Sequence, residues 1–303
     1  MPPSSKHFTL SFPRPHTLLV TINRPNQRNS IPSDAHWDAH AIFAWFDENP
    51  SLLVAIITGA GDKAFCAGQD LAEQSRNAAS RGSDQSPSAA QFAVTNHPPT
   101  GFLGLSQRKG KKPVLAAVNG FALGGGFETC LNWLVAYEFP SPFPLPPFPG
   151  LHGLMTADIS DMVVAAPTAQ FGLPEIAVGL YAAAGGPARL VKIVGYPLAA
   201  ELALTARRVS AQQALEYRLI NRVSSSPVDE CLALADAMAQ HSPDAIIITR
   251  QALREAWETA SAEQATIRTK QDYGSQLMKG ENFRIGVTAF ANKEKPKWVP
   301  SRL

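Results

Sequence analysis

The 303-residue chain is poor in cysteine and carries almost no excess of either charge. Its three cysteines, Cys66, Cys130 and Cys231, are few and odd in number, which argues against a disulfide framework and fits a reducing compartment. The 27 basic and 25 acidic side chains leave a net charge of +2. This balance gives no reason to expect nucleic acid or an anionic membrane as a partner.

Long hydrophobic runs and metal-binding patterns are also missing. No run approaches the roughly 18 apolar residues of a membrane-spanning helix. The segment Met1–Lys6 is not followed by the apolar region of a secretory signal. The seven histidines show no metal-ligand spacing, and His97 lies in a polar segment where we expect it to be solvated. We therefore expect no metal and no membrane attachment.

Apolar runs that read as strands recur through the first half of the chain. Residues 53–58, 114–118 and 162–166 are continuously apolar, which is typical of strands buried on both faces of a parallel sheet. Two earlier strands are predicted at residues 7–12 and 16–22, around a proline turn. Strands that alternate with helical segments predict βαβ units and hence an α/β domain.

Helical patterns lie between these strands and fill the second half. Residues 33–47 have helical periodicity, with one broad apolar face formed by Ala35, Trp37, Ile42, Phe43, Trp45 and Phe46. Residues 73–100 are polar and predict a mobile loop with a short helix. From Pro187 onward the chain turns helical. We therefore expect an α/β core at residues 1–205 and a helical region at residues 206–303.

Two glycine- and alanine-rich turns, each after a strand-like run, carry the chemistry. The first spans residues 64–71 (AFCAGQDL) and the second residues 121–128 (FALGGGFE). Glycine lets bare backbone approach a ligand, so two such turns can direct two N–H donors at one oxygen. Glu128 stands three positions after the middle glycine of the second turn. This combination predicts an oxyanion hole beside a catalytic carboxylate, and therefore chemistry through an enolate.

The same residues allow other interpretations. A phosphate-binding P-loop is excluded because no Lys-Ser/Thr pair follows the glycines, and the dinucleotide-binding spacing fails because position 129 is threonine. Taken alone, Glu128 equally fits a solvated helix residue, and Glu175, after Pro174, fits an acid at a helix start. Cys66 fits a small buried residue better than a nucleophile.

Together these segments resemble the enoyl-CoA hydratase/isomerase family, the crotonases. The resemblance extends from about Leu18 to Trp298, and its order and spacing are specific. Its parts are residues 22–25 (INRP), 64–71, 121–128, 169–175 (AQFGLPE), 183–186 (AAGG) and 204–211 (LTARRVSA). It implies a crotonase (ClpP-like) spiral of ββα units with a C-terminal helical region that forms trimers, or hexamers of two trimers.

The resemblance also implies a CoA thioester substrate and no separate cofactor, because CoA is part of the substrate. Ala67 and Gly125 match the residues whose N–H groups bind the thioester oxygen. The segment Ala67, Gly68, Gln69 and Asp70 matches the part that lies against the adenine end of CoA.

Glu128 and Glu175 match the two catalytic glutamates of hydratases. Glutamate at both positions favours an enoyl-CoA hydratase, equally a 3-hydroxyacyl-CoA dehydratase. In this hypothesis Glu128 activates water and Glu175 exchanges the proton at Cα. The alternatives are a Δ3,Δ2-enoyl-CoA isomerase, in which one acid suffices, and an inactive protein of the same fold. The acyl-chain specificity cannot be read from the sequence.

A proline-rich stretch interrupts the family pattern. The two glutamates stand 47 positions apart, where the family has about 20, and the excess is Trp133–Ser160. Six prolines between 140 and 149 exclude a helix or a central strand there. We hypothesise a retained intron, because codons for Trp133 and Ser160 rejoin as cysteine, the family's usual residue.

The last three residues, Ser301, Arg302 and Leu303, form a conservative variant of the Ser-Lys-Leu peroxisomal address. The prediction is a peroxisomal enzyme that binds the import receptor through this tripeptide, or a cytoplasmic one if the tripeptide is not read. Peroxisomal hydratases that resemble this chain suggest a mevalonyl-CoA-like or branched enoyl-CoA substrate.

Overall fold

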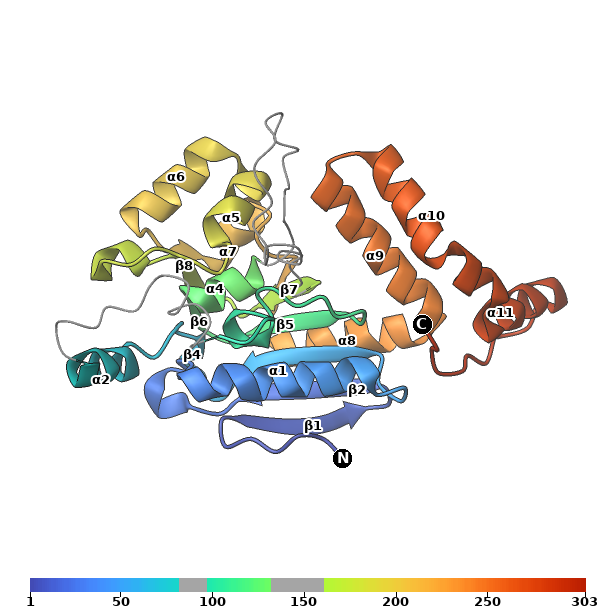
Figure 1. Cartoon of the computed structure of the whole chain (residues 1–303), viewed down its shortest axis with the longest axis horizontal. Coiled ribbons are helices and arrows are strands. Elements are labelled where there is room, and N and C mark those ends of the chain that lie inside the picture. Colours follow the sequence, from blue (N-terminus) through green and yellow to red (C-terminus); the bar gives the residue numbers. More distant parts are fainter. Residues whose placement is uncertain (82–96, 132–160) are drawn as a thin grey trace.

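The computed structural model describes residues 1–81, 97–131 and 161–303, and it shows two β-sheets surrounded by helices (Figure 1). The predicted insert Trp133–Ser160 lies outside the described residues. The larger sheet has the strand order β1-β2-β3-β5-β7-β10. Its strands are β1 (Phe8–Arg14), β2 (Thr17–Ile22), β3 (Val54–Gly59), β5 (Val114–Val118), β7 (Met162–Ala165) and β10 (Arg222–Val223).

The centre of the larger sheet confirms the predicted buried strands. Every residue of β3 and β5 is buried, as their continuous apolar runs require for strands covered on both faces. The pairs β2–β3, β3–β5, β5–β7 and β7–β10 are parallel, whereas β1 pairs antiparallel with β2.

The smaller sheet has the order β4-β6-β8-β9. Its strands are β4 (Ala64–Cys66), β6 (Phe121–Leu123), β8 (Gln170–Gly172) and β9 (Val209–Ser210). The chain passes from β3 to β4, from β5 to β6 and from β7 to β8, so each turn of the chain adds one strand to each sheet. This repetition is the ββα spiral that the sequence predicts, and it brings the ends of β4, β6 and β8 together.

Helices and short 3-10 turns follow the strands of the core. The first group is η1 (Pro25–Gln27), α1 (Ser33–Glu48), α2 (Leu71–Arg81), η2 (Phe102–Gly104) and α4 (Gly125–Cys130). The second is η3 (Glu175–Val178), α5 (Gly186–Val194), α6 (Tyr196–Thr205), α7 (Ala211–Glu216) and α8 (Pro227–Ala239). The helix α2 lies in the segment predicted as a loop with a short helix.

The buried face of α1 differs from the prediction at one turn. His36 is fully buried, whereas Trp37, which was predicted on the apolar face, is 45% exposed. The buried positions 35, 39, 42, 43 and 46 follow the helical repeat, and position 36 lies on that stripe while position 37 lies beyond its edge.

The predicted domain boundary at residue 205 is wrong. After it, β9 pairs with β8 and β10 pairs with β7, so both sheets are completed from residues beyond 205. The helix α8 then covers the larger sheet, where Cys231, Leu232 and Ala235 pack against Ile56 and Leu115. The core therefore extends to the end of α8.

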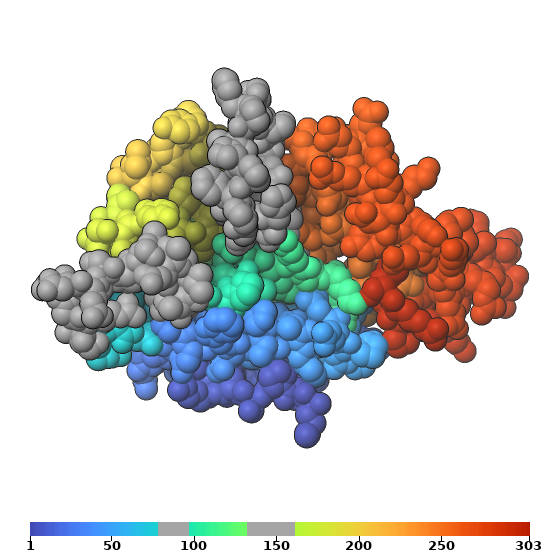
Figure 2. All heavy atoms as spheres, in the orientation of Figure 1, coloured from blue at the N-terminus to red at the C-terminus, as the bar shows by residue number. Residues whose placement is uncertain are grey.

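In the part of the chain that the structure describes, three helices remain outside the core: α9 (Pro243–Thr259), α10 (Ala262–Lys279) and α11 (Glu281–Asn292). They form a lobe at one side of the molecule, coloured orange to red in Figure 2. Among the described residues, no helix combines the length and apolarity that crossing a membrane requires. Assembly into trimers stays a prediction.

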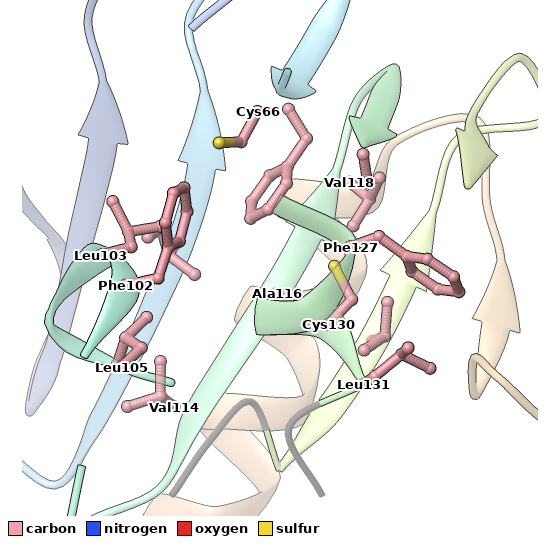
Figure 3. Close-up of a cluster of buried hydrophobic side chains, with 14 of the residues drawn as sticks. Cys66, Phe102, Leu103, Leu105, Val114, Ala116, Val118, Phe127, Cys130 and Leu131 are labelled. Carbon is pink, nitrogen blue, oxygen red and sulfur yellow. The ribbon is translucent and has the colours of Figure 1, made fainter. Parts of the chain in front are cut away.

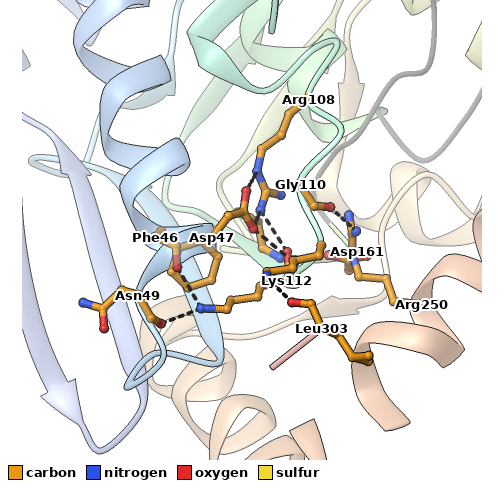
Figure 4. Close-up of polar contacts among 11 residues, drawn as sticks. Phe46, Asp47, Asn49, Arg108, Gly110, Lys112, Asp161, Arg250 and Leu303 are labelled. Carbon is orange, nitrogen blue, oxygen red and sulfur yellow. Dashed lines mark hydrogen bonds and ion pairs between the residues drawn. The ribbon is translucent and has the colours of Figure 1, made fainter. Parts of the chain in front are cut away.

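Buried ion pairs link α1 to the segment that precedes β5, and the lobe to the start of β7 (Figure 4). Arg108 binds both carboxylate oxygens of Asp47 on α1, at 2.5 and 3.1 Å. On α9, Arg250 donates to Asp161 at 2.6 Å and to the Gly110 carbonyl at 2.7 Å. Since Asp161 immediately precedes β7, this contact ties the lobe to the start of a core strand.

The C-terminal tripeptide lies close to this network. The Nζ of Lys111 donates to the Leu303 carbonyl, and the Leu303 N–H donates to Ser301 Oγ at 3.1 Å. Its role as a peroxisomal address stays a prediction.

Candidate active site

The second glycine turn, between β6 and α4, is built for close backbone approach. Gly124 has φ 54° and ψ −130°, a conformation that side-chain-bearing residues rarely adopt. Helix α4 begins directly after it, so the N–H of Gly125 has no acceptor within the helix. Figure 3 shows Phe127 and Cys130 of α4 in a buried cluster with Cys66 of β4, which fixes the helix on the smaller sheet. Cys66 is buried, as predicted.

The first glycine turn contacts the second. Gly68 has φ 90°, and a Cβ placed on it would lie 3.0 Å from the Leu123 carbonyl oxygen and 3.6 Å from the Gly125 nitrogen. The structure thus brings the two turns together, as the sequence predicts.

The amide of Ala67 is not the open donor of this turn. Its N–H donates to the Arg28 carbonyl at 3.1 Å, so it is already satisfied within the fold. The prediction that Ala67 donates to a thioester oxygen is therefore wrong in this geometry.

The amide of Gln69 is open instead. A parallel bridge joins Gln69 to Ile31: the Ile31 N–H donates to the Gly68 carbonyl at 2.9 Å, and the Asp70 N–H donates to the Ile31 carbonyl at 3.0 Å. In such a bridge the hydrogen bonds flank the central residue, whose own N–H points to the opposite side. No described residue accepts from the Gln69 N–H.

Asp70 anchors the first turn. Burial opposes its ionisation, but hydrogen bonds from Arg24, at 2.9 Å, and from the Glu73 N–H, at 3.1 Å, lower the pKa of the carboxyl. Asp70 therefore holds the turn and the start of α2 in place. The predicted contact of residues 67–70 with the adenine end of CoA stays a prediction.

Glu128 is buried on α4, at 2% exposure, and its Oε1 accepts the Gly186 N–H at 2.8 Å, at the start of α5. Burial raises the pKa of this carboxyl to about 7, and the nearby charge of Glu175 acts in the same direction. The hydrogen bond from Gly186 and the charge of Arg189 oppose the shift. Glu128 is thus divided between its two protonation states near neutral pH.

Glu175 is the first residue of η3, and its side chain lies close to Gly124. A Cβ on Gly124 would lie 2.7 Å from Glu175 Oε1, which places this oxygen directly above the turn. The other oxygen, Oε2, is buried and has no hydrogen-bond partner among the described residues. Burial raises the pKa of the Glu175 carboxyl as well. The structure therefore brings Glu128, Glu175 and Gly125 to one site.

Three aromatic residues beside this site were missed by the sequence analysis. His97 was predicted to be solvated, which is wrong: its ring is half-buried and lies 4.4 Å from the ring of His36, centroid to centroid. Phe102 lies 4.7 Å from His36 and packs on Gly125, where an added Cβ would be 2.6 Å from its ring. These contacts join three distant segments, and no local pattern could have indicated them.

An α/β spiral that holds open backbone amides beside one buried and one half-buried glutamate is the arrangement that the sequence resemblance predicts. The profile of the enoyl-CoA hydratase/isomerase family matches residues 16–133 and 152–300, and the chain belongs to this family. The unmatched interval between the two blocks falls inside the predicted insert.

Relatives and solved structures agree with this membership. The mevalonyl-coenzyme A hydratase of Beauveria bassiana is 39% identical over 305 residues, which cover 100% of this chain and 98% of that protein. The carnitinyl-CoA dehydratase of Escherichia coli K12 is 34% identical over 291 residues, 93% of this chain and 94% of that protein. The structure of an enoyl-CoA hydratase from Bacillus anthracis has a TM-score of 0.76 at 26% identity, covering 98% of this chain and 100% of that one.

Proposed function

We propose that this chain is a CoA-thioester hydratase, which adds water to the double bond of an enoyl-CoA or removes it from the 3-hydroxyacyl-CoA. The observation that carries the proposal is the pair of acids, buried Glu128 and half-buried Glu175, at the turn that holds the open Gly125 amide. Hydration needs both a base for water and an acid for Cα, and two carboxyls at one site supply both.

The thioester oxygen is bound by the N–H groups of Gln69 and Gly125 in this proposal. When water adds at Cβ, negative charge moves onto this oxygen and forms an enolate. Two donors already fixed by the fold stabilise that charge without rearrangement, at about 3 kcal/mol for each donor. Gly68 supports the assignment, because its lack of a side chain lets the first turn approach Gly125 closely.

The two glutamates divide the proton transfers. Ionised Glu128 takes a proton from the water whose oxygen bonds to Cβ, and protonated Glu175 gives a proton to Cα as the enolate collapses. Water is thus added as H and OH, and the two carboxyls exchange protonation states. Burial raises the pKa of both carboxyls, and adjacent carboxyls disfavour double ionisation, so the pair is expected to hold one proton. Hydration starts from the form of the pair in which this proton is on Glu175.

The names of the relatives support a proposal for the acyl group of the substrate. The names of the two relatives quoted above carry mevalonyl and carnitinyl groups, both of which are short, branched or polar acyl chains. We therefore propose a short, polar enoyl-CoA, with the dehydrated form of mevalonyl-CoA as the first substrate to try.

A turnover assay tests this function. The purified chain is given crotonyl-CoA and the dehydrated form of mevalonyl-CoA, and loss of the conjugated thioester absorbance is followed, with the 3-hydroxyacyl product identified by mass. We expect hydration of at least one of them. A chain that only shifts the double bond of a 3-enoyl-CoA is an isomerase, and thermal stabilisation by CoA thioesters without turnover indicates an inactive protein of this fold.

We also propose that the chain assembles through its C-terminal lobe and enters peroxisomes. Large apolar side chains are exposed on α9–α11, among them Leu253, Ile267, Met278, Val287 and Phe290, which supports burial against other copies. Light scattering of the purified protein should give the mass of a trimer or a hexamer. Fluorescent fusions with and without Ser301–Leu303 should differ in peroxisomal location.

A further inference from the structure

The imidazole of His36 is hydrogen-bonded on both sides. Its Nδ1 lies 2.9 Å from the Leu103 backbone nitrogen, and its Nε2 lies 2.8 Å from Gln69 Oε1. A backbone N–H can only donate, so Nδ1 must be the acceptor. The proton of the neutral ring is therefore on Nε2, which donates to the Gln69 side chain. Both ring nitrogens and the tautomer are fixed by the fold.

The surroundings of His36 keep the ring neutral and immobile. The side chain is fully buried, with the rings of His97 and Phe102 at 4.4 and 4.7 Å. Burial lowers the pKa of His36 to about 3, so the imidazole is uncharged through the neutral range. Burying such a polar ring is costly unless its nitrogens are paired, and here both are.

The two partners of His36 belong to the segments beside the two open amides. Gln69 carries one of them. Leu103 follows Phe102, and the Phe102 ring packs on Gly125, where an added Cβ would be 2.6 Å away. The single side chain of His36 on α1 thus links the first glycine turn to the residue that supports the second.

We propose that His36 is a positioning residue for the reaction, which holds the Gln69 and Gly125 amides at the spacing needed for both to reach one thioester oxygen. This inference rests on the proposed function, because the two amides matter only if they bind such an oxygen. A displacement of about 1 Å at a reacting group can cost roughly 100-fold in rate. A residue that holds the two amides at the right spacing therefore has a measurable effect on kcat.

Two substitutions separate the two hydrogen bonds. In H36N the side-chain oxygen lies near the place of Nδ1 and can still accept from Leu103, but the bond to Gln69 is lost. In H36Q the side-chain amide reaches the place of Nε2 and can still donate to Gln69 Oε1. Q69M removes the hydrogen bond between His36 and Gln69 at Gln69, which is less buried than His36. If H36N does not fold, Q69M tests this bond alone.

The measurements are kcat, KM and the spectrum of a bound chromophore, on the full-length protein. The probe is 4-(dimethylamino)cinnamoyl-CoA, whose absorption moves to longer wavelength when its carbonyl oxygen accepts hydrogen bonds. We expect H36N and Q69M to lose roughly 10- to 100-fold in kcat, with little change in KM and a smaller red shift. H36Q should stay close to the unsubstituted protein in both kcat and red shift.

The outcomes distinguish this inference from the function it rests on. Unchanged kcat and red shift in H36N or Q69M overturn the positioning role, even if the chain is a hydratase. Equal losses in H36Q and H36N also overturn it, because they indicate packing rather than the Gln69 bond. If the unsubstituted chain turns over no enoyl-CoA, the hydratase proposal fails, and the red shifts alone decide the role of His36. Absence of any red shift in the unsubstituted chain overturns the assignment of the two amides, and with it the role of His36, while the turnover assay still decides the hydratase proposal.

Discussion

Helix α4 and the η3 turn each carry one glutamate of the site, Glu128 and Glu175, and the surroundings of the two side chains differ. Glu128 is 2% exposed, and it lies on a helix fixed in the core and accepts a backbone N–H. Glu175 lies on a single 3-10 turn that contributes no buried residue, and one of its oxygens has no partner among the described residues. One acid is therefore held in a fixed orientation, whereas the other has an oxygen, unpaired among the described residues, that can bind a substrate.

Replacing Glu175 should have the largest effect. In E175Q the group that exchanges the Cα proton is gone, and we expect kcat to fall by roughly 1,000- to 10,000-fold with little change in KM. Deuterium exchange from solvent into Cα of a saturated acyl-CoA, followed by mass spectrometry, should stop as well. E216Q, at an exposed position outside the site, is the control. Full activity in E175Q would remove Glu175 from the mechanism.

Replacing Glu128 should cost less and leave one reaction intact. The glutamine oxygen of E128Q can still accept the Gly186 N–H and orient water, but it cannot take the proton. We expect hydration to fall by roughly 100- to 1,000-fold while deuterium exchange at Cα continues. If exchange stops in E128Q and persists in E175Q, the two roles are reversed.

The same E128Q substitution should raise stability in neutral solution. The Glu128 carboxyl has a pKa of about 7 when folded, against the ordinary 4.5 when unfolded. The unfolded chain therefore releases this proton first, and stability falls as pH rises from about 4.5 to about 7. The loss amounts to about 3 kcal/mol above pH 7, and E128Q should escape it. Chemical denaturation at pH 5 and pH 8 measures this; equal pH dependence in both proteins contradicts the raised pKa.

Two glycine substitutions disturb the acids one at a time. In G124A the new Cβ is 2.7 Å from Glu175 Oε1 and the backbone has a positive φ, so we expect lower stability and impaired Cα exchange. In G186A the Cβ is 2.7 Å from Glu128 Cγ on an ordinary helical backbone, so hydration should suffer while exchange survives.

Both glycine variants should lose roughly 10- to 100-fold in kcat, because the carboxyls are displaced rather than removed. Rates of hydration and of Cα exchange, with the melting temperature of each variant, provide the comparison. Equal loss of both reactions in both variants contradicts separate roles for the two acids.

Removing the insert should have the smallest effect on the chemistry itself. We expect a chain in which one cysteine replaces Trp133–Ser160 to fold, to melt at a higher temperature and to hydrate substrate at least as fast as the full chain. Circular dichroism and the turnover assay measure this. A shortened chain that fails to fold, beside an active full-length chain, rejects the retained-intron hypothesis. So do transcripts that never skip the segment.

Local patterns predicted the two turns but not the open amide in the first. The glycines of residues 64–71 and 121–128 signal close backbone approach wherever they occur. Which N–H remains open depends on the Arg28 carbonyl and the bridge from Ile31, and both are contacts between segments. The prediction that Ala67 is the donor was wrong for this reason.

The remaining errors have the same origin. The strands β9 and β10 have two residues each, too short to leave a pattern, so the core was predicted to end at residue 205. His97 looked polar in its own segment, but its ring packs at a tilt against the ring of His36, 61 positions earlier. A sequence pattern assigns polar residues to the surface, so it misplaces those that contacts with distant segments bury.

The proposed chemistry requires that the N–H groups of Gln69 and Gly125 donate to one thioester oxygen between the two glutamates. A crystal structure of E175Q with a bound 3-hydroxyacyl-CoA tests it most directly. We expect the thioester oxygen to lie about 2.7–3.1 Å from both backbone nitrogens. An oxygen more than about 3.5 Å from either nitrogen would contradict it.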